Sequence, residues 1–404
     1  MLVIGGGHNG LVCASYLAKV GYRVDILEAR TALGGGAASS DFAEGYRVSS
    51  LAHILHSLSP QVRSDLKLDA VGFDAGDSID TIALDRQGQH LTLGIDTVAG
   101  AELSAADVEA YGRFKREFIA YAKALEPLMM NKPPRLKDMD RRDKITLAKL
   151  GWQLRFGLGK TSMREFLRVG GINIYDVLNE VFDSPLLKGA IALDAVMGQH
   201  MGPRTPNTVL TYLHRLWGET HSRQSLPTGG MGSIAKALER AAAKAGVSMR
   251  TNAKVQRIIV DDGTAVGVEL ASGEQLYADI VISNADAKTT FLQLVNSSEL
   301  DAMFVHRVNS IRAKGDVAKL HLALDGLPKV IGLSAEQLAQ RLIIAPDMRY
   351  VEHAFNHSKY AEFSENPLLE ITIPSIADPS LAPSGRHVML SLIHISEPTR
   401  LGFI

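Results

Sequence analysis

The sequence predicts an α/β protein in which a nucleotide-binding domain with a parallel sheet alternates along the chain with a second domain. The chain opens with a short apolar run that breaks into a Gly-x-Gly-x-x-Gly loop, Leu2–Gly10. A later glycine loop, Leu226–Gly232, precedes another helix and several strands. A long segment between the two loops, Leu103–Arg223, has helical periodicity. The nucleotide-binding domain is expected at residues 1–75 and 225–300, and the second domain at 76–224 and 301–389.

The first glycine loop has the spacing that lets a backbone hold a diphosphate. Gly5 permits a tight turn, Gly7 lets the bare backbone approach the anion, and Gly10 lets the following helix lie close to the strand. The unpaired N–H groups and the positive dipole end of that helix stabilise an anion without a Lys or Arg. The other residues of the loop, which we expect to supply its geometry and further backbone donors, are Gly6, His8 and Asn9.

An acidic residue follows the second predicted strand, Tyr22–Leu27. Glu28 lies about 20 residues beyond the glycines, where a carboxylate can accept hydrogen bonds from ribose hydroxyls. A carboxylate at this place repels a 2′-phosphate, which disfavours NADP. The alternative, a solvated strand end, does not explain the complete series of strand, loop, helix, strand and acid.

A further glycine turn, Leu33–Ala37, comes soon after this acid, early enough for the backbone to follow an extended diphosphate and ribityl chain. In this order of motifs the sequence resembles the FAD-dependent phytoene desaturase and amine oxidase superfamily, and its Gly-Gly-Gly-His-Asn-Gly loop is most similar to the phytoene dehydrogenase-like branch. The resemblance implies FAD as cofactor and a Rossmann-type FAD-binding domain interleaved with a largely helical plus β-sheet substrate domain. It adds four residues to the expected cofactor-binding set: Ala29, Arg30, Gly34 and Gly35.

The resemblance resumes at Leu226–Gly232, which leads into an Ala-rich helix ending near Lys244. Alternating apolar positions separated by Asp-Gly and Ser-Gly turns then predict strands. In the superfamily this order is a helix, a strand passing the adenine, a small meander and a strand that returns to the nucleotide domain. The resemblance implies that the backbone of Val255 contacts the adenine.

The middle segment, Leu103–Arg223, is predicted to be mostly helical and is the natural place for a substrate domain. Apolar residues recur there at spacings of three and four, as in an amphipathic helix: Phe114, Phe118, Tyr121, Leu125 and Leu128. After a break at Pro133–Pro134, residues 132–168 carry eleven lysines and arginines against four acidic residues, together with apolar side chains. Such a mixture could make a peripheral contact with an anionic membrane. The simpler interpretation is a helix pair packed on the core with a solvated basic face.

No motif identifies a catalytic residue. The chain lacks a Gly-x-Ser-x-Gly elbow, a His-Glu-x-x-His motif and clustered Cys and His, so neither a nucleophile nor a metal site is predicted. The single cysteine, Cys13, excludes a redox dithiol and is more typical of a small core residue. His53 and His56 could approach the flavin or the substrate, although histidines with such apolar neighbours are more often structural.

The expected function is an FAD-dependent oxidoreductase that transfers a hydride from a C–H bond of an apolar small molecule to the flavin. Two alternatives stay open: an amine or amino-acid oxidase on the same fold, and a regulatory flavoprotein that binds a protein partner without turnover. The net charge of −1 provides no basic field for nucleic acid. Without a signal peptide or a membrane-spanning stretch, we expect a cytoplasmic protein, or a mitochondrial-matrix one in a eukaryotic homologue, with membrane association as a further possibility.

The C-terminal stretch departs from the resembled family, in which a late glycine-rich segment and a final helix close over the flavin ring. Ser391–Arg400 reads like a translated sequencing adapter, so residues 390–404 are expected to be an artefactual tail. The alternative is a genuine strand within 387–395. On the first interpretation, part of the wall around the flavin ring is missing and the activity belongs to the complete gene product.

Overall fold

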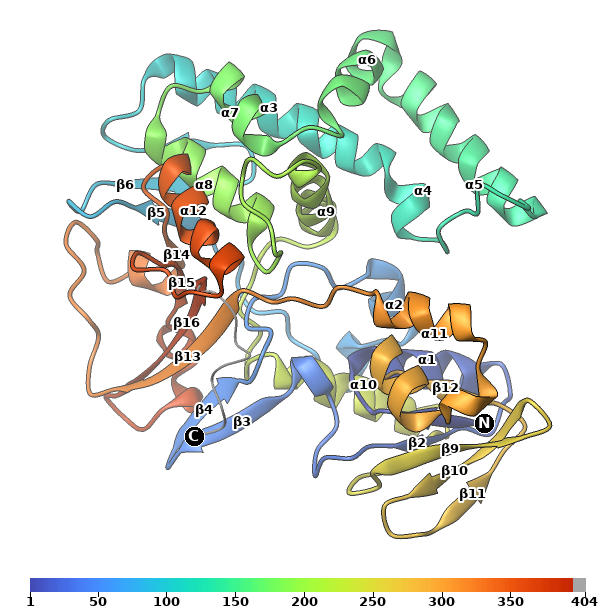
Figure 1. Cartoon of the computed structure of the whole chain (residues 1–404). Helices are drawn as coiled ribbons and strands as arrows, with labels where there is room; N and C mark the ends of the chain where they lie inside the picture. Colours follow the sequence, from blue (N-terminus) through green and yellow to red (C-terminus); the bar gives the residue numbers. More distant parts are fainter. Residues whose placement is uncertain (395–404) are drawn as a thin grey trace. The chain divides into compact units, whose positions relative to one another are not determined.

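The computed structural model describes residues 1–394, and the chain divides into two compact units, each built from two separate segments. The first unit comprises Met1–Asp77 and Ser225–Ala313. The second comprises Ser78–Gln224 and the described residues from Lys314 to His394. Figure 1 follows the chain by colour through this alternation. The expected α/β class with an interleaved second domain is confirmed.

The first unit contains a four-stranded parallel sheet in the order β12-β1-β2-β8. Its strands are β1 (Leu2–Ile4), β2 (Asp25–Leu27), β8 (Ser248–Arg250) and β12 (Val281–Ser283). The predicted returning strand is confirmed, because β12 pairs in parallel with β1. The strand predicted over 22–27 is shorter than expected and begins at Asp25. The reason is that β1 has only three residues, and its first, Leu2, is already opposite Asp25.

Two helices of the first unit pack against each other, α1 (His8–Lys19) and α10 (Gly232–Lys244). Ala14 of α1 and Ala237 of α10 are fully buried and belong to the same hydrophobic core cluster. The predicted Ala-rich helix is therefore confirmed. The remaining α-helices among the described residues of this unit are α2 (Pro60–Asp65) and α11 (Ala302–Asn309).

The predicted meander is confirmed as a three-stranded antiparallel sheet, drawn in yellow in Figure 1. Its strands are β9 (Val255–Asp261), β10 (Thr264–Leu270) and β11 (Gln275–Tyr277). The turn between β9 and β10 places Asp262 at φ 43° and Gly263 at φ 71°, which explains the Asp-Gly pair. A separate hairpin consists of β3 (Ser39–Ala43) and β4 (Tyr46–Ser49).

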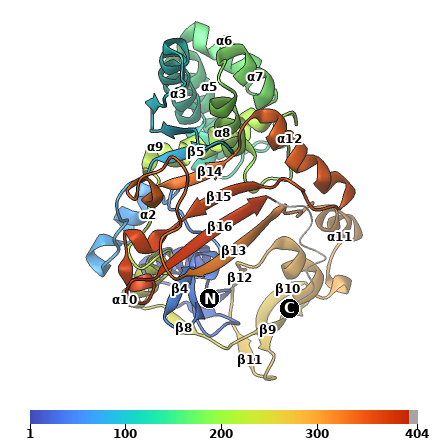
Figure 2. The same cartoon turned by 90° about the vertical axis from the view of Figure 1, so that its left-hand side faces the viewer.

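The second unit is organised on a seven-stranded sheet in the order β13-β16-β15-β14-β5-β6-β7, seen in Figure 2. Its strands are β5 (Thr81–Leu84), β6 (His90–Leu93), β7 (Val98–Ala99), β13 (Val317–Leu324), β14 (Arg341–Ile344), β15 (Leu368–Thr372) and β16 (His387–His394). The parallel pairing of β5 with β14, in which Ile82 is opposite Leu342, joins the unit's two chain segments.

Helices occupy most of the stretch predicted to be helical, and that prediction is confirmed. They are α3 (Ala105–Ala124), α4 (Glu126–Met129), α5 (Arg141–Trp152), α6 (Gly159–Val169), α7 (Ile174–Val181), α8 (Pro185–Val196) and α9 (Thr208–His221); α12 (Met348–Asn356) belongs to the later segment. The predicted apolar face of α3 is buried, and the rings of Phe114 and Phe118 lie 4.1 Å apart between centroids.

The end of the described chain is a strand. β16 pairs along its whole length with β13, and its second half pairs with β15. The first residues of the stretch expected to be a tail, 390–394, thus form part of this strand, and the rest of that stretch lies outside the described residues. No helix within residues 1–394 is long and apolar enough to cross a membrane.

Candidate cofactor site

The first glycine loop makes a turn that only glycine tolerates at two of its positions. Gly5 has φ 93°, and its N–H donates to the Leu27 carbonyl at 2.8 Å, which ties the turn to β2. A Cβ on Gly10 would lie 2.2 Å from the Gly5 carbonyl oxygen. Helix α1 therefore passes as close to the end of β1 as its backbone allows.

The start of α1 is suited to an anion. Its N-cap is Gly7, with φ −66° and ψ 167°, and no side chain within the described residues caps the helix. The first N–H groups of a helix have no partner inside it, and the dipole adds positive charge there. Because Gly7 has no side chain, a ligand can approach these donors closely, as a diphosphate requires.

Glu28 is held between the two turns that follow β1 and β2. Its side chain is buried, with Oε2 accepting the Gly6 N–H at 2.7 Å and Oε1 accepting the Arg30 N–H at 2.9 Å. Each carboxylate oxygen can accept a further hydrogen bond. The backbone thus fixes the carboxylate, and its remaining acceptor capacity fits the hydroxyls of a ribose.

The second glycine turn, Leu33–Ala37, lies directly against the first glycine loop. The Gly34 N–H donates to the Gly6 carbonyl at 2.8 Å, and a Cβ on Gly35 would lie 2.9 Å from the Gly7 Cα. Gly34 has φ 113° and Gly35 has φ 56°. The structure therefore brings together the two glycine turns that the sequence separates by more than twenty residues.

The remaining expected contacts lie at the same strand ends. Ala29 and Arg30 have exposed side chains. The Glu28 carbonyl accepts the Ala253 N–H at 2.8 Å, which anchors the segment leading into β9. Val255 is the first residue of β9 and is buried. Assignment of these residues to the cofactor stays a prediction.

The later glycine loop packs on the β3–β4 hairpin through hydroxyl groups. Ser49 Oγ accepts the Met231 N–H at 3.0 Å, and Ser39 Oγ accepts the Gly232 N–H at 2.9 Å. A hollow of about 370 Å³ lies beside them. Its lining comes from the second glycine turn, the hairpin and the start of α10, and includes Leu33, Ser39, Arg47, Gly229 and Lys236.

The histidine segment belongs to the same unit. His53 is buried and His56 is half-buried. Leu55 between them exchanges two backbone hydrogen bonds with Ser225, at 2.9 and 3.0 Å, so the segment is tied to the later glycine loop. A role for either histidine in chemistry stays a prediction.

Burial raises the pKa of the Cys13 thiol, as expected for a thiol that is not reactive.

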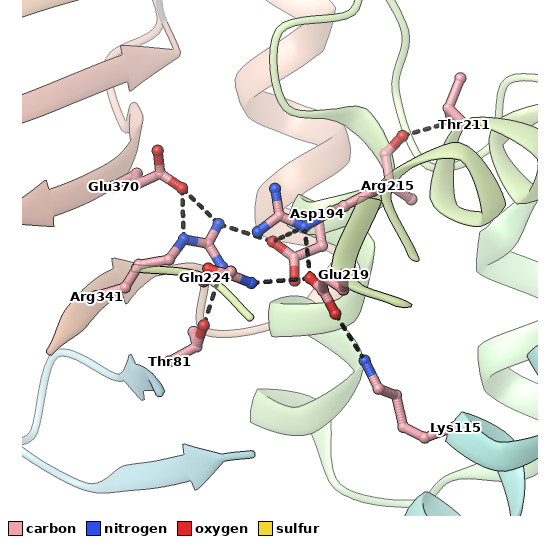
Figure 3. Close-up of polar contacts among 10 residues, drawn as sticks. Thr81, Lys115, Asp194, Thr211, Arg215, Glu219, Gln224, Arg341 and Glu370 are labelled. Atoms are coloured by element: carbon pink, nitrogen blue, oxygen red, sulfur yellow. Dashed lines mark hydrogen bonds and ion pairs between the residues drawn. The ribbon is translucent and has the colours of Figure 1, made fainter. Parts of the chain in front are cut away.

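Sequence reasoning missed a buried charge cluster in the second unit, drawn in Figure 3. At its centre is Arg341 of β14, whose side chain is 0% exposed. Its Nη2 lies 2.7 Å from Asp194 Oδ1, its Nε lies 2.5 Å from Glu370 Oε2, and its Nη1 donates to Thr81 Oγ1 at 3.1 Å. One guanidinium thus joins helix α8 to strands β5, β14 and β15.

The cluster continues through Glu219 of α9. Glu219 Oε2 lies 3.4 Å from Lys115 Nζ, and Oε1 lies 3.5 Å from Arg215 Nε and accepts from Gln224 Nε2 at 2.8 Å. Burial acts to raise the pKa of Glu219, but the charges of Lys115 and Arg215 outweigh it and lower the pKa to about 2. The acids and bases of the cluster thus compensate one another, which is typical of a structural network.

Lys319 of β13 is a second group without a sequence signal. It lies in one row across the sheet with Glu370, separated from it by Leu392 of β16. Burial lowers the pKa of Lys319 to about 8, although the charge of Glu370 opposes the fall. A lysine with this pKa can hold or release a proton near neutral pH.

Replacing Glu28 by Gln should weaken FAD binding about tenfold, because the amide keeps one acceptor oxygen and loses the charge that strengthens hydrogen bonds to ribose. The amide NH2 group would also place a hydrogen-bond donor against the N–H of Gly6 or of Arg30, which now donates to a carboxylate oxygen. Titration of apoprotein with FAD, followed by flavin fluorescence, measures the loss. Glu44→Gln, at an exposed position of the same unit, is the control and should bind like the unmodified protein. Equal affinities for all three proteins would contradict the assignment.

The chain is similar to known proteins along almost its whole length. The family model for flavin containing amine oxidoreductase matches residues 10–393. The chain is 30% identical to pyridine nucleotide-disulfide oxidoreductase domain-containing protein 2 of Mus musculus, over 96% of this chain and 72% of the mouse protein. It is 28% identical to the neurosporene-forming phytoene desaturase of Cereibacter sphaeroides, over 97% and 72%. Among solved structures, an oxidoreductase from Methanosarcina mazei has the same fold, with a TM-score of 0.59 and 19% identity over 98% of this chain and 79% of that one.

Proposed function

Because the chain belongs to the flavin-containing amine oxidoreductase family and uses FAD as its cofactor, we propose that it oxidises a carbon–hydrogen bond of a lipophilic small molecule in a phytoene dehydrogenase-like reaction. The observation that supports flavin-dependent oxidation is the start of α1, where Gly7 stands in place of a capping side chain. Glu28 and the second glycine turn converge on the same point.

The chain's own residues then have distinct tasks. The amides at the start of α1 bind the diphosphate, and the Glu28 carboxylate orients the adenosine ribose. Gly34 and Gly35 let the backbone follow the cofactor past the first turn. When bound, FAD supplies the redox chemistry by taking up a hydride from the substrate carbon.

The lipophilic substrate is supported by similarity to a phytoene desaturase over nearly the whole chain. The single cysteine argues against disulfide reduction, which needs a pair of thiols. Amine oxidation is the second candidate, and the description of the matching family favours it. The two candidates differ in the polarity of the substrate, which an experiment can vary directly.

The test is anaerobic reduction of the FAD-loaded protein by candidate substrates. Three panels are compared by visible absorption: isoprenoid polyenes in detergent micelles, aliphatic amines, and amino acids. Bleaching by a member of the first panel alone is the expected result. Bleaching by an amine or amino acid alone would replace the proposal with its second candidate. A flavin that every compound leaves oxidised, yet that dithionite bleaches, would favour a regulatory flavoprotein.

A further inference from the structure

Helix α5 and the π-helical turn that continues it, Gln153–Gly157, carry apolar side chains on two opposite faces. They form one continuous helix in Figure 1. One face packs on the hydrophobic core of the second unit through Leu150 and Leu154. The basic, apolar mixture predicted for this segment is therefore explained by core packing only on this inner face.

The opposite face exposes three large apolar side chains, which we call the outer stripe: Ile145, Trp152 and Phe156. They are 46%, 66% and 60% exposed. Their spacings of seven and four residues place them on one side of a helix. The rings of Trp152 and Phe156 lie 4.4 Å apart between centroids. The outer stripe is thus a row of exposed apolar side chains that the core of this unit does not bury.

Cationic side chains surround the outer stripe. Arg155 lies 5.2 Å from the centre of the Phe156 ring, and Lys149 is one turn from both Ile145 and Trp152. None of the ion pairs formed within residues 1–394 involves the exposed cations of this helix, which are Arg141, Arg142, Lys144, Lys149 and Arg155.

The acids nearby offset only part of this positive charge, and Asp140 interacts electrostatically with Arg135 and Arg142. Asp140 and Asp143 are engaged in the cap of α5, where each carboxylate accepts the other residue's N–H, at 2.8 and 3.1 Å. Glu165 pairs with Arg168. Residues 132–168 therefore carry a marked positive excess, eleven cationic against four acidic side chains, in a chain whose net charge is −1.

We propose that α5 and its π-helical turn lie on the surface of an anionic lipid bilayer, with the outer stripe in the boundary between head groups and acyl chains. Trp and Phe suit that depth, and long Lys and Arg side chains can extend from it to anionic head groups. The centre of a protein–protein interface is depleted of charge, whereas here cations flank each apolar side chain. The charge pattern thus favours a membrane over a protein partner.

Sedimentation with vesicles tests the contact. The full chain should pellet with vesicles of phosphatidylcholine and phosphatidylserine, and far less with vesicles of phosphatidylcholine alone. Salt that screens the charges should lower partitioning onto the anionic vesicles about tenfold. Trp152→Ser with Phe156→Ser should lower partitioning at least tenfold. The matched control, Tyr360→Ser with Phe363→Ser, removes two aromatic side chains of the same unit that are 75% and 58% exposed, and should partition like the unmodified protein.

Tryptophan emission provides a second measurement. The chain has two tryptophans, so Trp217→Phe leaves Trp152 as the only reporter. Its emission should shift to the blue when anionic vesicles are added. No sedimentation with anionic vesicles, or no shift, would overturn the proposal. It would also be overturned if the outer-stripe variant pellets normally but loses self-association in size-exclusion chromatography, because a second copy of the chain would then cover the stripe.

Discussion

Replacing Gly7 by Ala should lower FAD affinity about a hundredfold or more while leaving the apoprotein close to its original stability. The methyl group would stand between the first amides of α1 and the diphosphate, which approaches the backbone at this residue. Within the protein its nearest neighbour would be Asn284 Nδ2 at 3.3 Å, a tight contact that the end of the Asn284 side chain relieves by shifting a few tenths of an ångström. The backbone angles of Gly7, φ −66° and ψ 167°, are ordinary for Ala. The expected cost to the apoprotein is about 1 kcal/mol or less, from the weaker N-cap.

Gly10→Ala is the matched variant with the opposite expectation. Its methyl group would lie 2.2 Å from the Gly5 carbonyl oxygen, so α1 must move away from β1. Overpacking of this kind costs about 1–3 kcal/mol, and each kcal/mol lowers the melting temperature by roughly 2–4 °C in a unit of this size. This variant should therefore lose stability and FAD binding together.

Thermal melts with and without FAD distinguish the two variants. The unmodified protein should gain stability with FAD. Gly7→Ala should melt like the unmodified apoprotein and gain almost nothing, whereas Gly10→Ala should melt lower in both conditions. If Gly7→Ala keeps the full FAD-dependent gain, the loop does not hold the diphosphate as inferred.

The nucleotide-binding loops could be predicted from sequence because their requirements are local. A turn at positive φ needs Gly5, a close helix–strand approach needs Gly10, and an acid ends the second strand at Glu28. Each requirement fixes a residue type at a fixed offset along the chain. The very short strand β8 gave no such signal, because three residues cannot show an alternating pattern.

The buried charge cluster could not be predicted, since its partners are distant in sequence. Arg341 meets Asp194 and Thr81 across 147 and 260 residues. A lone Arg or Glu in a strand or helix is usually exposed, and only the tertiary fold shows that these are not. The outer stripe could not be predicted from the sequence for a related reason. Composition showed apolar residues among cations in 132–168, but which of them face the core depends on how the helix packs.

Arg341→Met should be among the most destabilising single substitutions in the second unit, at about 3–5 kcal/mol, because it removes the guanidinium that pairs with both Asp194 and Glu370. Arg215 remains beside Asp194 at 3.3 Å. Both tryptophans, Trp152 and Trp217, belong to this unit. Urea unfolding followed by tryptophan fluorescence therefore reports on it directly.

Two companion variants separate the loss of charge compensation from a general effect of removing an arginine. Adding Glu370→Gln to Arg341→Met removes a carboxylate that has lost the Arg341 guanidinium. It should restore about 1–2 kcal/mol of the free energy of unfolding, a coupling that a double-mutant cycle measures. Arg223→Met breaks an ion pair with Asp80 whose partners are 52% and 40% exposed, and should cost less than about 1 kcal/mol. Similar losses for Arg341→Met and Arg223→Met would mean that the buried cluster contributes no more than a surface ion pair. The network would then not be what holds α8 to the sheet.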